Sequence, residues 1–127
     1  PKLKVIGVSM DRGAAMYESQ KAGKPIFVKE EESLADALTG GIGLDNEYTF
    51  DLTKELVDDI VLVSEKEIAE GIHHAYWHES QIVEGAGAVA IASLLNNKFS
   101  PKGPSLALLC GRNINIEKHF NLISAKK

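Results

Sequence analysis

The stretch Leu106–Asn113 reads Leu-Ala-Leu-Leu-Cys-Gly-Arg-Asn and passes from a continuous apolar run into a glycine turn. A Gly-Pro pair precedes the run and Gly111 follows it, so the pattern predicts a strand at Leu106–Leu109 that is buried on both faces, as in parallel sheets. Ligands of open α/β sheets bind beyond the carboxyl ends of the strands. We therefore expect Cys110, which ends this strand, to face a ligand.

The length, net charge and cysteine content of the chain limit the kinds of protein it can be. It has 127 residues, which suits one domain and is short for a complete two-domain enzyme. A formal net charge of -4 without a basic stripe argues against nucleic acid and anionic membranes as partners. A single cysteine cannot form an internal disulfide, and no apolar run fits a membrane span or a signal peptide. We expect a cytoplasmic protein, with further sequence preceding the early first strand.

Apolar periodicity and helix start and stop signals divide the chain into alternating strands and helices. Strands are expected at Val5–Val8, Asp59–Val63 and Leu106–Leu109, with a short extended piece at Ile26–Val28. Helices are expected at Gly13–Lys21, Leu34–Leu38, Tyr48–Leu56, Glu65–Glu79, Glu84–Leu95 and Ile116–Ile123. This order predicts an α/β fold with three αβα layers, in which helices cover both faces of a parallel sheet of at least three strands.

The helix at Glu65–Glu79 has the strongest local signals. Ser64 and Glu67 have the spacing of a capping box, which satisfies backbone amides at a helix start. The side chains expected on its buried face, at helical spacing, are Ile68, Ile72, Ala75 and Tyr76. Asp11 and Ser33 are expected to cap the helices that follow them.

Three features allow more than one interpretation. Thr39–Asn46, with three glycines in four residues, is either a loop between elements or a ligand-facing loop. Glu84 precedes an apolar helix and is either a structural cap or a carboxylate held there for binding. Glu70, His74 and His78 lie at i, i+4 and i+8 and either bind a metal or form a solvated face. We favour the solvated face, because no glutamate lies inside the histidine pair.

Five short strings, spread along the chain, are specific when taken together. They are Ile6-Gly7-Val8, Ser33-Leu34-Ala35-Asp36 with Ile42-Gly43-Leu44, Leu56-Val57-Asp58-Asp59-Ile60, Val83-Glu84-Gly85-Ala86-Gly87 and Cys110-Gly111-Arg112-Asn113. Together they resemble the pyridoxal-phosphate enzymes of the serine/threonine dehydratase family, whose fold is called type II. The strings Gly-Gly-Ile-Gly-Leu-Asp-Asn-x-Tyr-Thr-Phe and Ile-Val-Glu-Gly-Ala-Gly-Ala are most similar to the dehydratases of hydroxyectoine utilisation. The resemblance implies that residues 1–127 are one domain, the C-terminal part of the catalytic domain and a partial large domain of the type II fold.

The resemblance implies a role for seven residues toward pyridoxal phosphate and an amino acid substrate. Cys110 stands where family members place a serine or cysteine that hydrogen-bonds the pyridine nitrogen of the cofactor. A neutral partner leaves that nitrogen largely unprotonated, so the ring is a weaker electron sink, which still suffices for loss of a β-hydroxyl. The other residues assigned to the cofactor pocket are Glu84, Gly85, Gly111 and Asn113, and those on the substrate side are Asp36 and Ala37.

Three features of the family are not matched. Ser9 and Ala15 stand where some relatives have carboxylate ligands for a divalent metal, so no such site is expected. The Schiff-base lysine, in a Ser-x-Lys motif near the start of the full enzyme, has no counterpart, and neither has the glycine-rich phosphate loop. Ser64-Glu65-Lys66 repeats the letters of the motif but lacks the Arg-Gly-Ala that follows it. The chain alone is therefore expected to hold no catalytic residue and to be inactive.

Two classes of function stay open. As part of a dehydratase, the chain forms one wall of a site that converts threonine, serine or a related hydroxy amino acid into a keto acid and ammonia. As a stand-alone module, it binds a small molecule or pairs with another protein. In either class a fragment of a continuous sheet exposes apolar edges, so we expect a homo-oligomer.

Overall fold

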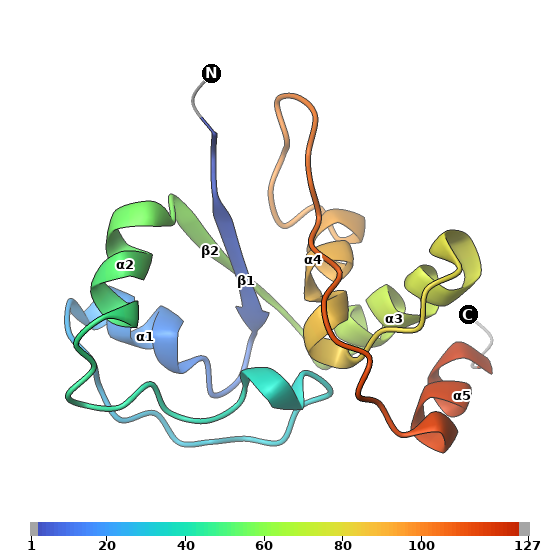
Figure 1. The fold of residues 1–127 in the computed structure, drawn as a ribbon, viewed down its shortest axis with the longest axis horizontal. Coiled ribbons are helices and arrows are strands. Elements are labelled where there is room, and N and C mark those ends of the chain that lie inside the picture. The colour runs from blue at the N-terminus through green and yellow to red at the C-terminus, as the bar shows by residue number, and fades with distance from the viewer. Residues whose placement is uncertain (1–2, 125–127) are drawn as a thin grey trace.

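The computed structural model describes residues 3–124 and has an α/β architecture with a parallel sheet (Figure 1). Its elements in chain order are β1 (Ile6–Met10), α1 (Ala15–Ala22), the 3₁₀ helix η1 (Asp36–Leu38), α2 (Thr49–Leu56), β2 (Asp59–Val63), α3 (Glu65–Glu79), α4 (Gly85–Leu95) and α5 (Ile116–Ser124). Figure 1 shows the strands between the α1–α2 pair and the group formed by α3, α4 and α5. The layered α/β class predicted from the sequence is confirmed.

The carboxyl ends of the two strands are buried and lie next to α4. β1 and β2 pair in parallel, with Ile6 opposite Asp59 and Met10 opposite Val63. Parallel neighbours need a long crossover, which here contains α1, η1 and α2. Met10 and Val63, at the carboxyl ends of the two strands, are both 0% exposed and belong to the core that also includes α4. The carboxyl ends of the strands therefore lie next to the helix that carries the candidate site.

The core is centred on α3 and α4, which approach each other closely through small residues. A Cβ on Gly71 of α3 would lie 2.8 Å from the carbonyl oxygen of Ala88 on α4. The face of α3 predicted from helical spacing is confirmed, with buried Ile68, Ile72 and Ala75 and half-buried Tyr76. α4 is buried, as expected for a helix that is apolar on all sides. Within residues 3–124, no helix has the length and apolar content needed to cross a membrane.

The start of α3 is capped as the sequence predicts. The hydroxyl of Ser64 accepts the N–H of Glu67 at 3.4 Å, and the Glu67 carboxylate accepts the N–H of Ser64 at 2.7 Å. Glu67 also pairs with Lys98 at 2.8 Å. Burial raises the pKa of Glu67, but hydrogen bonds from Lys98 and Ser64 outweigh burial, so this pKa lies below its ordinary value. The capping box is confirmed, and an ion pair reinforces it.

The strand expected at Leu106–Leu109 is wrong for this chain. The segment forms no assigned strand, and Leu106 and Leu108 are 88% and 73% exposed. A strand requires a neighbour whose backbone groups pair with its own. Within residues 3–124 the sheet consists of β1 and β2 alone, rather than three or more strands. Among the described residues, the apolar run therefore has no neighbouring strand to pair with.

Two expected helix caps are also wrong. Ala14, not Asp11, is the N-cap of α1, because the N–H of Asp11 still continues the sheet and donates to the carbonyl of Val63 at 2.9 Å. Ser33 does not start a helix over Leu34–Leu38, where only η1 forms. The hydroxyl of Ser33 donates instead to the carboxylate of a distant glutamate. In both places a long-range contact overrides a local signal.

Candidate site at the N-terminus of α4

Five of the predicted site residues meet where α4 begins. They are Glu84, Gly85, Cys110, Gly111 and Asn113. The N–H of Glu84 donates to the carbonyl of Gly111 at 3.2 Å, and the N–H of Asn113 donates to the Glu84 carboxylate at 2.8 Å. These two hydrogen bonds attach the segment 110–113 to the first turn of α4. The site therefore joins two parts of the chain that are remote in sequence.

Two glycines allow this attachment. Gly111 has a φ of 87°, in the left-handed region, and a Cβ on it would overlap the Glu84 carboxylate. A Cβ on Gly87, inside the first turn of α4, would overlap the carbonyl oxygen of Cys110. The backbone of residues 110 and 111 consequently lies directly on α4, while Cys110 itself stays exposed. The result is an open wall with a thiol on its surface.

The substrate-side pair lies at the same end of α4. Asp36 and Ala37 are in η1, which packs on α4, and both are exposed. Gly85 permits this packing, because a Cβ there would overlap the carbonyl oxygen of Leu34. The Asp36 carboxylate accepts the N–H of Ala37 at 2.9 Å. All seven residues singled out from the sequence therefore gather around one helix end, although their roles stay predictions.

The side chain of Glu84 does not act as a helix cap. Glu84 occupies the N-cap position of α4, but it makes no side-chain capping bond. Its carboxylate accepts the N–H of Asn113 instead. Glu84 is thus the N-cap residue of α4 by position only, and its carboxylate binds the segment 110–113.

Two residues that the sequence did not single out hold the loops on this side of the molecule. Asn46 closes the glycine-rich stretch, which is a loop as expected. Its side-chain amide donates to the carbonyl of Ile42 at 2.7 Å and accepts the N–H of Phe50 at 2.9 Å. Glu65, in the first turn of α3, accepts the N–H of Leu34 at 2.7 Å. No local pattern indicates this last contact, since its partners are 31 positions apart.

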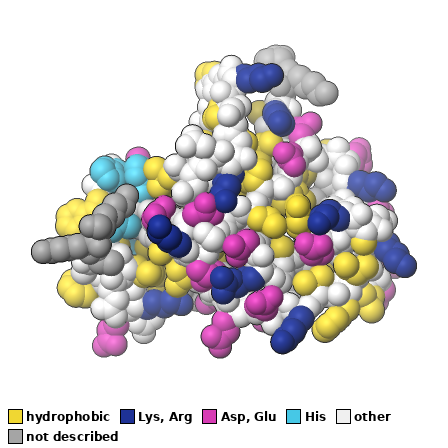
Figure 2. Space-filling model, turned by 180° about the vertical axis from the view of Figure 1, so that it is seen from behind, with side chains coloured by type: hydrophobic (Ala, Val, Ile, Leu, Met, Phe, Trp, Pro, Cys, Tyr) yellow, Lys and Arg dark blue, Asp and Glu magenta, His cyan; other side chains and the backbone are white. Residues whose placement is uncertain are grey.

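The histidines of α3 form a polar surface. The rings of His74 and His78 stack with centroids 4.5 Å apart, and His74 lies 3.6 Å from the carboxylate of Glu79. Figure 2 shows histidine side chains together at one edge of the molecule. Within the part of the chain that the structure describes, no three His, Cys, Asp or Glu residues are placed to hold a metal ion. Ser9 and Ala15 are the two positions where the family resemblance would place carboxylate ligands for a metal. The hydroxyl of Ser9 contacts the sulfur of Met10 at 3.5 Å, and Ala15 is buried.

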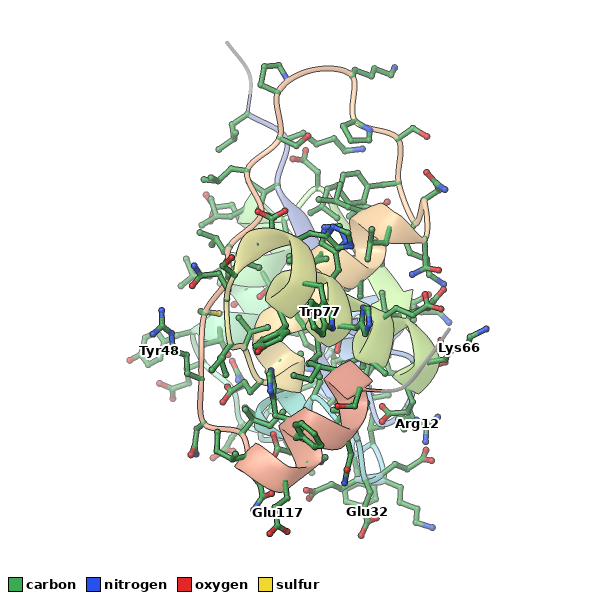
Figure 3. All side chains as sticks on the ribbon, turned by 90° about the vertical axis from the view of Figure 1, so that its right-hand side faces the viewer. Arg12, Glu32, Tyr48, Lys66, Trp77 and Glu117 are labelled. Carbon is green, nitrogen blue, oxygen red and sulfur yellow. The ribbon has the colours of Figure 1, made fainter. Side chains whose placement is uncertain are left out.

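Lys66 occupies the position that repeats the letters of the family's lysine motif. It is exposed in the first turn of α3 and projects outward at the edge of the molecule (Figure 3). The preceding Ser64 is engaged in the capping box rather than in a turn that presents the lysine to a pocket. Lys66 is therefore placed as a surface residue of a capped helix.

Comparisons with known proteins identify the family and the fold of this chain. Residues 1–111 match the family model described as "Pyridoxal-phosphate dependent enzyme". A putative threonine dehydratase of Sinorhizobium fredii is 54% identical over 125 residues, which cover 98% of this chain and 38% of the relative. The L-threonine ammonia-lyase of Thermotoga maritima is 36% identical over 125 residues, covering 98% and 30%. The processed form of threonine deaminase isoform 2 from Solanum lycopersicum superposes with a TM-score of 0.79 at 29% identity, covering 96% of this chain and 37% of that one.

Proposed function

This chain belongs to the family of pyridoxal-phosphate dependent enzymes, and we propose that it forms one wall of the active site of a dehydratase acting on a hydroxy amino acid. It spans 38% of the length of the S. fredii relative. The remaining walls then come from sequence outside this chain. The observation that carries the proposal is the attachment of the exposed Cys110–Asn113 segment to Glu84 at the start of α4.

The exposed wall suits the pyridine ring of the cofactor. Cys110 offers a neutral thiol, a weak donor and acceptor, on an accessible surface. Gly111 has no side chain, so the backbone beside the thiol can lie directly against the Glu84 carboxylate. Glu84 holds both residues in place through its two hydrogen bonds to the segment 110–113. When bound, pyridoxal phosphate supplies the electron sink that eases removal of the α-proton of an amino acid.

The residues of this chain bind and orient in this proposal and do not transfer the proton. Asp36 and Ala37 are exposed beside the wall and take the substrate side. The catalytic lysine and the phosphate loop belong to sequence outside the chain, because Lys66 projects from a surface helix (Figure 3). The chain by itself is then inactive.

Threonine or a related hydroxy amino acid is the substrate class that the proposal favours, with a keto acid and ammonia as products. Support comes from the relatives whose names state threonine dehydratase or L-threonine ammonia-lyase. The two strings similar to the dehydratases of hydroxyectoine utilisation favour a role in ectoine degradation. Cytoplasmic location and self-association stay predictions, the second from exposed apolar residues such as Leu106 and Phe120.

The test extends the reading frame on both sides of this chain and expresses the full-length protein. We expect visible absorbance from bound cofactor and release of keto acid from threonine, serine or a related hydroxy amino acid. The 127-residue chain, shown by intact mass to be free of longer protein, should release none. Deamination by the isolated chain would contradict the proposal. A reading frame that starts with the chain itself would favour the stand-alone binding module.

Cys110 offers a sharper test within the full-length enzyme. Cys110→Ala removes the neutral partner and should weaken cofactor binding or slow deamination. Cys110→Ser is the matched control, because a hydroxyl can replace the thiol as donor and acceptor. Unchanged cofactor affinity and rate in the alanine variant would remove the role assigned to Cys110.

A further inference from the structure

We propose that Glu65 is a positioning residue, which holds the loop that carries Asp36 and Ala37 at the N-terminus of α4. The inference rests on the proposed function, because the placement of these two residues matters only if they face the substrate. Between α1 and η1, residues 23–35 form no helix or strand. Regular backbone structure therefore does not hold this loop, and its position depends on contacts from elsewhere.

Each carboxylate oxygen of Glu65 has its own partner in the loop. Oε1 accepts the hydroxyl of Ser33 at 2.6 Å, and Oε2 accepts the N–H of Leu34 at 2.7 Å. The hydroxyl of Ser33 in turn accepts the N–H of Ala35 at 3.0 Å. Two successive loop residues are thus bound directly to Glu65, and a third is bound through the hydroxyl of Ser33. Hydrogen bonds to a charged acceptor are roughly twice as strong as those between neutral groups, so this attachment outweighs an ordinary loop contact.

The loop is held from its other side by α4. The carbonyl of Leu34 packs against Gly85, where a Cβ would overlap it, and Ala35 is 0% exposed. The N–H of Leu38 donates to the carbonyl of Ala35 at 2.9 Å, which fixes η1 to the held residues. The position of Asp36, between them, is therefore set by the two helix starts together.

Other charged groups near the start of α3 do not compete strongly for the Glu65 carboxylate. Glu67 performs the capping and pairs with Lys98, so α3 does not need Glu65 as a cap. Arg12 lies 3.8 Å from Glu65 and 3.5 Å from Asp11, both longer than the loop contacts. Both carboxylate oxygens of Glu65 are consequently available to the loop.

The test compares Glu65→Ala and Glu65→Gln with Glu67→Ala in the full-length enzyme. Glu65→Ala removes both loop bonds, whereas Glu65→Gln keeps a carbonyl oxygen for the N–H of Leu34 and should restore part of the effect. Glu67→Ala weakens the same helix start through the capping box without a contact to the loop. It therefore controls for a general loss of stability. Should Glu65→Ala fail to fold, Ser33→Ala removes one of the two bonds from the loop side.

Two measurements distinguish positioning from a purely structural role. Hydrogen exchange at the amides of Leu34–Leu38 should rise in Glu65→Ala, rise less in Glu65→Gln and stay unchanged in Glu67→Ala. The KM for the hydroxy amino acid should rise on the order of tenfold in Glu65→Ala, as the loss of one hydrogen bond to the substrate predicts. Cofactor absorbance should not change, because the wall at Glu84 and Cys110 is untouched.

The activity of the wild-type full-length enzyme separates a failure of the positioning role from a failure of the proposed function. Unchanged exchange in Glu65→Ala, raised exchange with an unchanged KM, or an equal rise of KM in Glu67→Ala each overturns the positioning role alone. A wild-type full-length enzyme that deaminates no hydroxy amino acid overturns the proposed function, and the positioning role with it.

Discussion

Two segments of this chain are apolar on every side in sequence, but they differ in burial. α4 has seven buried residues, whereas Leu106, Leu108 and Leu109 are 88%, 73% and 39% exposed. A helix satisfies its backbone N–H and C=O groups internally, so α4 needs only side-chain packing to be buried. The run at Leu106–Leu109 needs a neighbouring strand, which we expect from sequence outside this chain. Apolar composition therefore indicates that a segment is to be buried, and backbone pairing decides whether this chain can bury it.

The largest effect is expected from shortening a buried side chain of α4. Ile91 is 7% exposed in the core, so Ile91→Ala should lower the free energy of unfolding of the chain by ~2–5 kcal/mol. Leu108→Ala, the matched change in the exposed run, should alter it by less than about 0.5 kcal/mol. Urea unfolding of both variants measures the difference. A similar loss in both would show that the Leu106–Leu109 run is buried in solution.

An intermediate effect is expected where α4 contacts Cys110 and Gly111, the residues that follow the exposed run. Gly87→Ala adds up to about 1 kcal/mol of helix propensity, but its Cβ overlaps the Cys110 carbonyl, and overpacking costs about 1–3 kcal/mol. We expect the overlap to dominate and the melting temperature to fall. Gly103→Ala is the control, since nothing lies within 4 Å of a Cβ at that position. A melting temperature raised by Gly87→Ala would mean that residues 110–111 do not rest on α4.

The smallest effect is expected at α5, which returns the chain to the core after the exposed run. His119 is 4% exposed, lies edge-on to Tyr76 at 5.5 Å, and its Nε2 has no hydrogen-bond partner among the described residues. Burial lowers the pKa of His119, so the unfolded chain, with a pKa of about 6.5, binds the proton more readily. Stability should be constant above that pH and fall as the pH drops through about 6.5 toward the folded-state pKa.

The measurement for His119 is the free energy of unfolding across this pH range. His119→Gln, which cannot take up a proton, should show less decline than the wild type. Equal declines in both proteins would assign the pH dependence to groups other than His119.

Local signals predicted most of the fold because they act over short distances. The capping box of Ser64 and Glu67 spans one helical turn, and the buried face of α3 follows from helical spacing alone. The same kind of signal failed at Ser33, because the Ser33 hydroxyl donates to the carboxylate of Glu65, which is distant in sequence. It failed at Asp11 because the sheet continues past Val8, where the apolar run indicates its end, as far as Met10 and the N–H of Asp11.

The candidate site was predictable by residue but not by geometry. A resemblance distributed over the whole chain pointed to Cys110, Glu84 and Asp36, and the structure brings all three to the start of α4. The hydrogen bond from Asn113 to Glu84 was not predictable, since it depends on two backbone segments approaching across glycines. Helix propensity and apolar periodicity do not predict which distant backbone segments will lie against each other.

The amino-acid sequence alone was enough to identify the enzyme family, the parallel α/β class, and the capping box and apolar face of α3. The capping box and the apolar face depend on residues close together in one helix, whereas the family follows from strings spread along the chain. Only the folded chain decided that Leu106–Leu109 stays exposed, that Glu65 holds the loop at Leu34, and that Glu84 binds Asn113 instead of capping α4. Each of these depends on which distant backbone groups meet and which pairing partners the chain itself contains.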